Sequence, residues 1–257
     1  MNRRDFLLAV VATPCVMCGQ RKAAAVQAPA APEESGLPLL KKMQAALGGA
    51  ERLDAVRDVD WTVSAKTWNA AGLPGPDTVR RIRWIKPNIF RKDQHAGGIT
   101  VLEFFDGAGG WEVVPDGGLV ELKGSELEIV RSEALGFQLD NWLADRIPYL
   151  RVSSGGPGII RIAAENNVTG SIDIVVDRSS ALPVRSFASP LAGSPASSYQ
   201  RVHQRMEFIE WQTANSIRWP HRTFNFHDDV KRADIVTTAL KINSGLDAHE
   251  LSSRPQG

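Results

Sequence analysis

Three apolar-rich runs near the end of the chain, of which the first and the third alternate between apolar and polar residues, constrain its fold more than any other feature. They span residues 202–211, 217–227 and 235–243, and short polar turns containing Asn215, Asp228 and Asp229 separate them. Alternation with a period of two is typical of antiparallel strands that bury one face, and short turns favour pairing of neighbouring strands. Three such strands are too few to be stable alone, so the rest of the chain must extend or cover them.

The remainder of the chain repeats this pattern of strands and turns. Strands are predicted over residues 59–68, 79–86, 89–95, 99–105, 110–114, 119–122, 159–164, 170–177 and 184–188. Glycine- and proline-containing turns connect them, with loops expected over 153–158 and 190–198. Because no helix separates successive strands, the pattern indicates antiparallel meanders rather than a parallel sheet.

Two segments have helical periodicity instead. Residues 38–47 place leucines and Met43 on one face and end at Gly48-Gly49. Residues 125–135 and 137–147 are predicted as two consecutive helices, with a capping box at Ser125. An antiparallel sheet with one apolar face needs a cover, and we expect this helical pair to provide it. The predicted fold is therefore mainly β (α+β), with eleven or twelve strands in two half-sheets.

The first 28 residues have the organisation of an export signal. Arg3-Arg4 precede an apolar run over residues 7–18, and Arg21-Lys22 and three alanines follow it. The run is too short to span a membrane, and the paired arginines resemble a twin-arginine signal. An N-terminal helix buried in the domain is the structural alternative. We predict a signal peptide over 1–28, a linker over 29–36, one β domain over 37–250 and a disordered tail over 251–257.

The predicted location is the periplasm. The two cysteines, Cys15 and Cys18, both lie in the leader, and Gly19 after Cys18 leaves a lipid anchor at Cys18 as an alternative. Residues 1–28 contain four of the 30 basic and one of the 29 acidic residues, which leaves a charge of about −2 for the remainder. Such a nearly neutral domain argues against binding to nucleic acid.

The residues that carry common chemistry are sparse. His221 and His227 are six residues apart, on one face of a strand, and Asp228 follows them, but no carboxylate motif lies between them. The sequence has no Gly-x-Ser-x-Gly motif and no glycine-rich loop between a strand and a helix. We therefore predict no catalytic residue, no metal site and no cofactor.

Several short segments of the sequence are similar to those of one known family. The chain resembles the LolA/LolB-like superfamily of periplasmic outer-membrane lipoprotein carriers, through residues 39–49, 105–111, 177–185, 206–211, 217–222 and 242–246. This resemblance implies an open, strongly curved antiparallel half-barrel of about 11 strands, whose concave apolar face is covered by helices and accepts an acyl chain. It also implies an arginine that faces the cavity, for which the candidates are Arg80, Arg81, Arg83 and Arg91.

The leading hypothesis is a binding or carrier protein without enzymatic activity, a monomer that holds a lipid or an acylated protein. The expected apolar lining consists of Ile82, Trp84, Leu102, Phe104, Leu127, Phe137, Leu139, Trp142 and Phe208. Core packing is the alternative role of each of these side chains. Two other functions stay open: a structural or adaptor domain with an envelope protein partner, and a hydrolase with a site near His221, His227 and Asp228.

Overall fold

The structure is a computed structural model that describes residues 35–114, 118–135, 138–165, 170–194 and 198–254. The signal peptide predicted over 1–28 and most of the linker predicted over 29–36 lie outside these residues.

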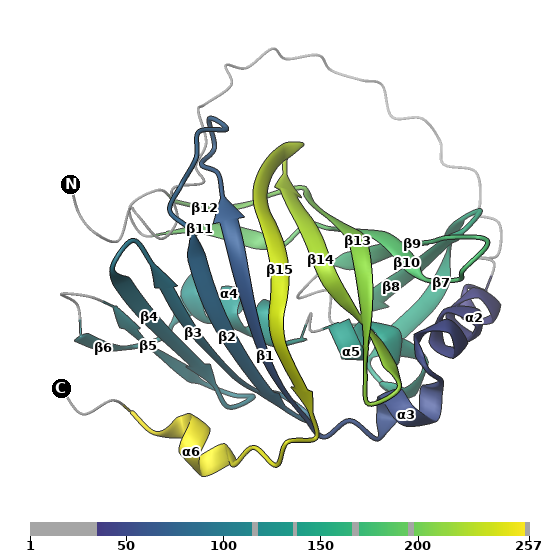
Figure 1. Cartoon of the computed structure of the whole chain (residues 1–257), viewed down its shortest axis with the longest axis horizontal. Coiled ribbons are helices and arrows are strands. Elements are labelled where there is room, and N and C mark those ends of the chain that lie inside the picture. Colours follow the sequence, from purple (N-terminus) through teal and green to yellow (C-terminus); the bar gives the residue numbers. More distant parts are fainter. Residues whose placement is uncertain (1–34, 115–117, 136–137, 166–169, 195–197, 255–257) are drawn as a thin grey trace.

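One curved antiparallel sheet forms most of the described chain (Figure 1). Its first meander contains β1 (Asp58–Thr67), β2 (Thr78–Ile85), β3 (Ile89–Ala96), β4 (Ile99–Phe105), β5 (Gly110–Val114) and β6 (Gly118–Glu121). Its second contains β7 (Leu150–Gly156), β8 (Ile159–Ala164), β9 (Ser171–Val176), β10 (Pro183–Ala188), β13 (Gln204–Ala214), β14 (Ile217–His227) and β15 (Val230–Ile242). The two predicted half-sheets are therefore both present.

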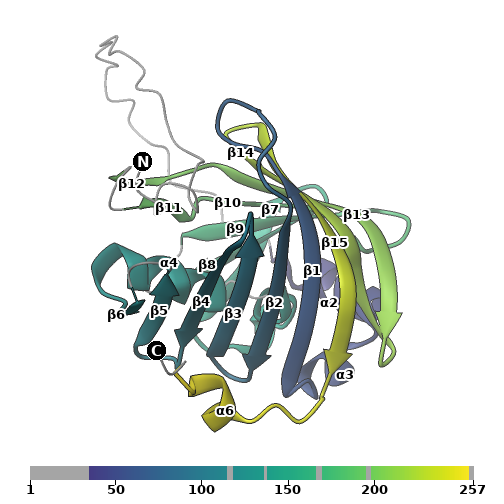
Figure 2. The same ribbon diagram turned by 60° about the vertical axis from the view of Figure 1, so that its left-hand side comes forward.

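Pairing between the first and the last strand joins the two meanders. β1 runs antiparallel to β15, from Val59 opposite Ile242 to Thr67 opposite Ala233. The described residues consequently form a single 13-stranded sheet, in the order β6-β5-β4-β3-β2-β1-β15-β14-β13-β10-β9-β8-β7. Figure 1 shows the sheet curving around α4 and α5, and Figure 2 shows α4 inside the same curve, which confirms the expected open half-barrel.

The strand count differs from the prediction at two places. β7 occupies part of the segment 153–158. This segment is predicted as a loop because its serines and glycines lack the alternation of a strand. The second predicted loop, over 190–198, contains a small separate hairpin of β11 (Leu191–Ser194) and β12 (Ser198–Arg201). Both are short or glycine-rich strands, whose pairing depends on backbone hydrogen bonds rather than on side-chain alternation.

The helices occupy the predicted positions. α2 (Leu37–Leu47) and α3 (Ala50–Asp54) precede the sheet, and α2 buries Leu40, Met43 and Leu47 completely. α4 (Gly124–Leu135), α5 (Gln138–Trp142) and a 3₁₀ turn, η1 (Ala144–Arg146), form the inserted segment. α4 and α5 lie within the curve of the sheet and pack on its apolar face, so the helical cover of the concave face is confirmed (Figure 1).

The two faces of the sheet differ in chemistry. The concave face carries the largest apolar cluster, which joins α2, α3 and α5 to the sheet, and a smaller cluster beneath α4. The convex face carries bidentate ion pairs between neighbouring strands, among them Arg81–Asp60 and Arg222–Asp234. Paired charges of this geometry stabilise cross-strand contacts and make the outer face hydrophilic.

The end of the chain covers part of the convex face. α6 (Ala248–Ser252) packs Leu251 against Phe104 and Trp111, whose rings stack 5.4 Å apart. Leu251 is 2% exposed, and Arg91 donates a hydrogen bond to its carbonyl oxygen. The tail predicted over 251–257 therefore begins with a buried residue, because the convex face has an apolar patch of its own that Leu251 covers.

Candidate binding site on the concave face

A continuous row of aromatic rings crosses the concave face. Trp61 on β1, Trp219 on β14, Trp142 on α5, and Trp211 and Phe208 on β13 contact one another in this order, with ring centroids 5.6 to 6.2 Å apart. These distances and the tilted or edge-to-face geometries are those of favourable aromatic pairs. We call these five residues the aromatic strip.

A polar contact fixes one end of the strip. The indole nitrogen of Trp61 donates a hydrogen bond of 3.0 Å to the hydroxyl of Thr237, which donates in turn to the carbonyl oxygen of Pro220. These two hydrogen bonds connect β1, β15 and β14. The orientation of the Trp61 ring is therefore set by the sheet, before any ligand binds.

Much of the apolar concave surface remains partly accessible. Trp219 and Trp142 are buried, whereas Trp61 and Trp211 at either side of them are only half-buried. Other half-buried apolar side chains on the same face are Ile82, Met206, Ile235 and Leu240. Apolar side chains therefore keep some accessible surface on the concave side of the sheet.

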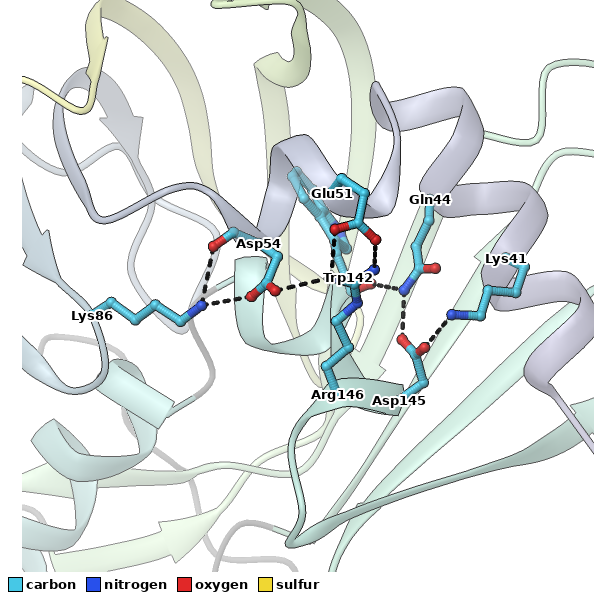
Figure 3. A network of polar contacts seen from close by, with 8 residues as sticks. All are labelled: Lys41, Gln44, Glu51, Asp54, Lys86, Trp142, Asp145 and Arg146. Atoms are coloured by element: carbon cyan, nitrogen blue, oxygen red, sulfur yellow. Dashed lines mark hydrogen bonds and ion pairs between the residues drawn. The ribbon is translucent and has the colours of Figure 1, made fainter.

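A network of polar contacts holds α5 and η1 to the N-terminal helices (Figure 3). Gln44 of α2 donates to the carbonyl oxygen of Trp142 at 2.9 Å and to the carboxylate of Asp145 at 2.6 Å. Arg146 forms ion pairs with Glu51 and with Asp54 of α3, and Lys86 pairs with Asp54 from the end of β2. The C-terminal part of the inserted segment is thus anchored on two sides.

α4 contacts both the sheet and β12, where Arg201 pairs with Glu128 at 3.3 Å and the hydroxyl of Tyr199 donates to Glu126. Val130 and Ala134 pack on Phe90 and Phe105, and Glu133 pairs with Lys92 of β3 at 2.8 Å. Lys92 also pairs with Glu103 of β4 at 2.6 Å.

Burial affects the ionisation of this charge cluster. Burial acts to lower the pKa of Lys92, but the carboxylates of Glu103 and Glu133 outweigh it, and the pKa lies above its usual value. Burial raises the pKa of Glu103. One ion pair in a low-dielectric setting therefore connects the cover to the sheet.

The structure places the predicted lining residues on both faces. Ile82, Trp84, Leu139, Trp142 and Phe208 lie on the concave side, and Leu127 of α4 packs against the cluster that contains Phe90 and Phe105. Leu102 and Phe104 instead belong to the convex cluster with Leu251, because the neighbouring Phe105 takes the concave position. Phe137 lies outside the described residues.

The four arginine candidates also separate by face. Arg81 and Arg83 pair with Asp60 and Asp93, and Arg91 contacts Trp111 and Leu251 on the convex side. Arg80 has the same parity along β2 as Ile82 and Trp84 and therefore points to the concave side. Its Nε has no hydrogen-bond partner among the described residues, and burial lowers its pKa.

The residues of the hydrolase hypothesis do not converge. His221 and His227 share a face of β14, but the carboxylate of Asp228 accepts a hydrogen bond from the backbone of His203 at the exposed turn. Across the described ranges, no three His, Cys, Asp or Glu side chains gather as a metal site requires. In the same ranges, no helix is long and apolar enough to cross a membrane.

A pocket of about 300 Å³ lies elsewhere, near one end of the convex face. Asp173, Phe187 and Arg205 line it from neighbouring strands, and Phe187 is 41% exposed. Sequence reasoning did not identify this pocket, because an exposed phenylalanine beside charged residues looks like an ordinary outer face.

These features define an open antiparallel half-barrel that holds helices within its curve, and solved structures with this architecture have a LolA-like fold. A LolA superfamily protein from Nitrosomonas europaea is similar with a TM-score of 0.54 at 8% identity, covering 85% of this chain and 98% of that one. An outer membrane lipoprotein-sorting protein domain from Vibrio parahaemolyticus is similar with a TM-score of 0.53 at 10% identity, covering 84% and 95%. A DUF1329 family protein from Desulfovibrio piger has a TM-score of 0.52 at 10% identity, covering 85% and 97%.

At these identities the likeness concerns the fold. No protein-family model matches the sequence, and no curated protein matches it. The chain therefore has a LolA-like fold.

Proposed function

We propose that this protein is an exported carrier in the periplasm, which holds an acyl chain of a lipid or lipoprotein between the curved sheet and the inserted helices. The aromatic strip is the observation that carries this proposal, because Trp61 and Trp211 present accessible apolar surface inside the half-barrel. Burial of each methylene group contributes about 0.8 kcal/mol, so a partly covered chain binds well. The LolA-like fold supports the proposal.

In this proposal α4 moves and α5 stays. α5 and η1 are anchored to the N-terminal helices by Gln44, Glu51 and Asp54. α4 contacts the sheet through a small apolar cluster and the Lys92–Glu133 ion pair, and its Glu128 pairs with Arg201 of the β11–β12 hairpin. An entering acyl chain displaces Leu127 and Val130 from the concave face and takes their place. Trp142 then remains as the fixed wall of the site.

Fluorescence tests the proposal, because four of the seven tryptophans belong to the aromatic strip. We expect 9,10-dibromostearate to quench the emission saturably and stearate to reverse the quenching by competition. In Trp211→Phe the quenchable fraction falls, whereas the matched control Trp68→Phe, a half-buried ring beside Lys231 on the convex side, retains it. Quenching that rises linearly without saturation contradicts the proposal.

An adaptor role is the second candidate, and the convex pocket favours it. Phe187, Asp173 and Arg205 offer an apolar contact between opposite charges, which suits a protein side chain. An adaptor has no use for the concave face, so it predicts no saturable quenching in the same experiment.

A further inference from the structure

Three polar side chains with unpaired atoms, as far as the described residues show, gather at the shared end of β14 and β15. Asn225 and His227 lie on the same face of β14 as Trp219, and the pairing of Asn225 with Ala233 places them beside Arg232. Asn225 Oδ1, both ring nitrogens of His227, and Nε and Nη2 of Arg232 are buried and lack a hydrogen-bond partner among the described residues. Buried polar groups are nearly always paired in native proteins, so such a cluster indicates a polar ligand.

The guanidinium of Arg232 forms no ion pair with the described residues. Arg232 is only 6% exposed, and no carboxylate of the described residues lies within ion-pair distance of it. Asp228 is close enough to act on its charge, but it sits in the exposed turn, where it binds the backbone of His203. A buried cation that lacks a partner is costly, and an anion removes that cost.

His227 provides neutral polar groups beside the cation. Burial lowers the pKa of His227 to about 4; the charge of Arg232 contributes in the same direction, and Asp228 acts against both. At neutral pH the ring therefore has one donor and one acceptor nitrogen. Together with the Arg232 guanidinium, it offers hydrogen bonds of the kind that phosphate and carboxylate oxygens accept.

The cluster continues the line of the aromatic strip. Phe208, the last ring of the strip, lies opposite Thr223, and the next concave pairs along β13 and β14 are Met206–Asn225 and Gln204–His227. The apolar wall thus leads into the polar cluster along two paired strands. An amphiphile with its chain on the strip would direct its head group toward Arg232.

We propose that Asn225, His227 and Arg232 form a subsite for the anionic head group of the bound amphiphile. The inference rests on the carrier function proposed above and adds the chemical class of the ligand: an acyl chain that ends in a phosphate or a carboxylate. We call this group of three residues the head-group subsite.

Amphiphiles that share a dodecyl chain test the subsite without any mutation. We expect dodecyl phosphate and dodecanoate to bind at least about tenfold more tightly than uncharged 1-O-dodecylglycerol, as charge-assisted hydrogen bonds predict. Dodecyltrimethylammonium should bind most weakly. The comparison of the two anions identifies which head group is preferred, and equal binding of the anionic and uncharged compounds overturns the subsite while leaving the carrier function intact.

Substitutions of single arginines test whether the preference for anionic amphiphiles depends on Arg232. Arg232→Met should remove the preference for anions and leave binding of 1-O-dodecylglycerol unchanged, whereas Arg232→Lys should keep most of the preference. Arg81→Met is the matched control, because Arg81 is an arginine of the convex face that pairs with Asp60. Loss of the preference in the Arg81 variant alone contradicts the assignment.

A separate NMR measurement tests the head-group subsite even if no amphiphile binds and the carrier function is wrong. Inorganic phosphate titrated into the wild-type protein should shift the NMR signals of the His227 ring. Unchanged His227 signals overturn the head-group subsite, and shifted signals support an anion site that is independent of acyl chains.

Discussion

The ring of Trp142 meets the ring of Trp219 edge to face, with centroids 5.6 Å apart and planes inclined at 75°. This contact connects the inserted segment to the centre of the sheet, and both rings are essentially buried. Because Gln44 also binds the backbone of Trp142, one residue joins three parts of the fold: α2, α5 and β14.

Trp142→Ala should therefore destabilise the protein strongly. Truncation of a buried aromatic side chain usually costs about 3–5 kcal/mol, through lost burial and the cavity that remains. Denaturant unfolding followed by circular dichroism measures this loss. Tyr149→Ala provides the comparison, because Tyr149 is 38% exposed and its truncation should cost far less. Equal losses in the two variants would mean that Trp142 does not organise the concave face.

The turn between α2 and α3 requires glycine at one position more than at the next. Gly48 has φ +125°, and a Cβ there would lie 2.4 Å from the carbonyl oxygen of Ser216. Gly49 has φ +101°, but no atom lies within 4 Å of a Cβ at that position. Both alanine substitutions incur backbone strain of about 1 kcal/mol or more, and Gly48→Ala adds a steric conflict with the β13–β14 turn. Thermal unfolding should show a larger loss for Gly48→Ala, and the reverse order would contradict this packing.

A buried carboxylate on α5 makes the stability depend on pH. Burial raises the pKa of Asp140 to about 7 from its usual 3.8, although Lys86 acts in the opposite direction. Between these two values the unfolded chain has lost the proton that the folded protein keeps, so stability falls as pH rises from about 4 to about 7 and then levels off. The total loss is at most about 4 kcal/mol.

Asp140→Asn removes the ionisable group and should flatten this part of the stability profile. Unfolding in urea at a series of pH values compares it with the wild type and with Asp77→Asn, which alters an exposed carboxylate. The prediction is wrong when the slope between pH 4 and pH 7 is the same in all three proteins.

The ion pair between α4 and the sheet should control ligand entry. Glu133→Gln leaves Lys92 paired with Glu103 but removes its contact with α4, so α4 should open more often. We expect faster quenching by dibromostearate in stopped-flow experiments, by about two- to fivefold for the loss of a partly exposed ion pair of about 0.5–1 kcal/mol. Glu121 lies on β6 and forms an exposed ion pair with Lys123. Glu121→Gln removes this pair and should keep the wild-type rate. Unchanged kinetics in Glu133→Gln would show that α4 does not gate the site.

The sequence was sufficient to predict the sheet, because most strands alternate over five or more residues between recognisable turns. It was also sufficient for α2 and the inserted helices, whose apolar residues recur with helical spacing. It was not sufficient to assign faces in β4: Phe104 and Phe105 are adjacent and both buried, so alternation alone cannot say which one lines the concave side. The charge of Glu103 suggests a solvent-facing side chain and so favours Leu102 and Phe104 as the concave residues. In the structure Glu103 lies on the concave side, where it pairs with Lys92.

The head-group subsite escaped prediction for a related reason. The register between β14 and β15 shifts between Asn225 and Phe226, and Arg232 lies within this irregularity. Regular alternation along β15 would place Arg232 on the face opposite to Ala233. Only the folded structure brings Arg232 beside His227, which sequence reasoning had associated with a metal or hydrolytic site instead.

Native mass spectrometry of the protein, purified from a lipid-containing host and followed by organic extraction, tests the carrier function most directly. The account predicts a stoichiometric mass increment, whose extracted material contains an acyl chain with a phosphate or carboxylate group. A protein that has only its own mass, and that keeps it after incubation with fatty acids and phospholipids, would contradict the carrier function and favour the adaptor.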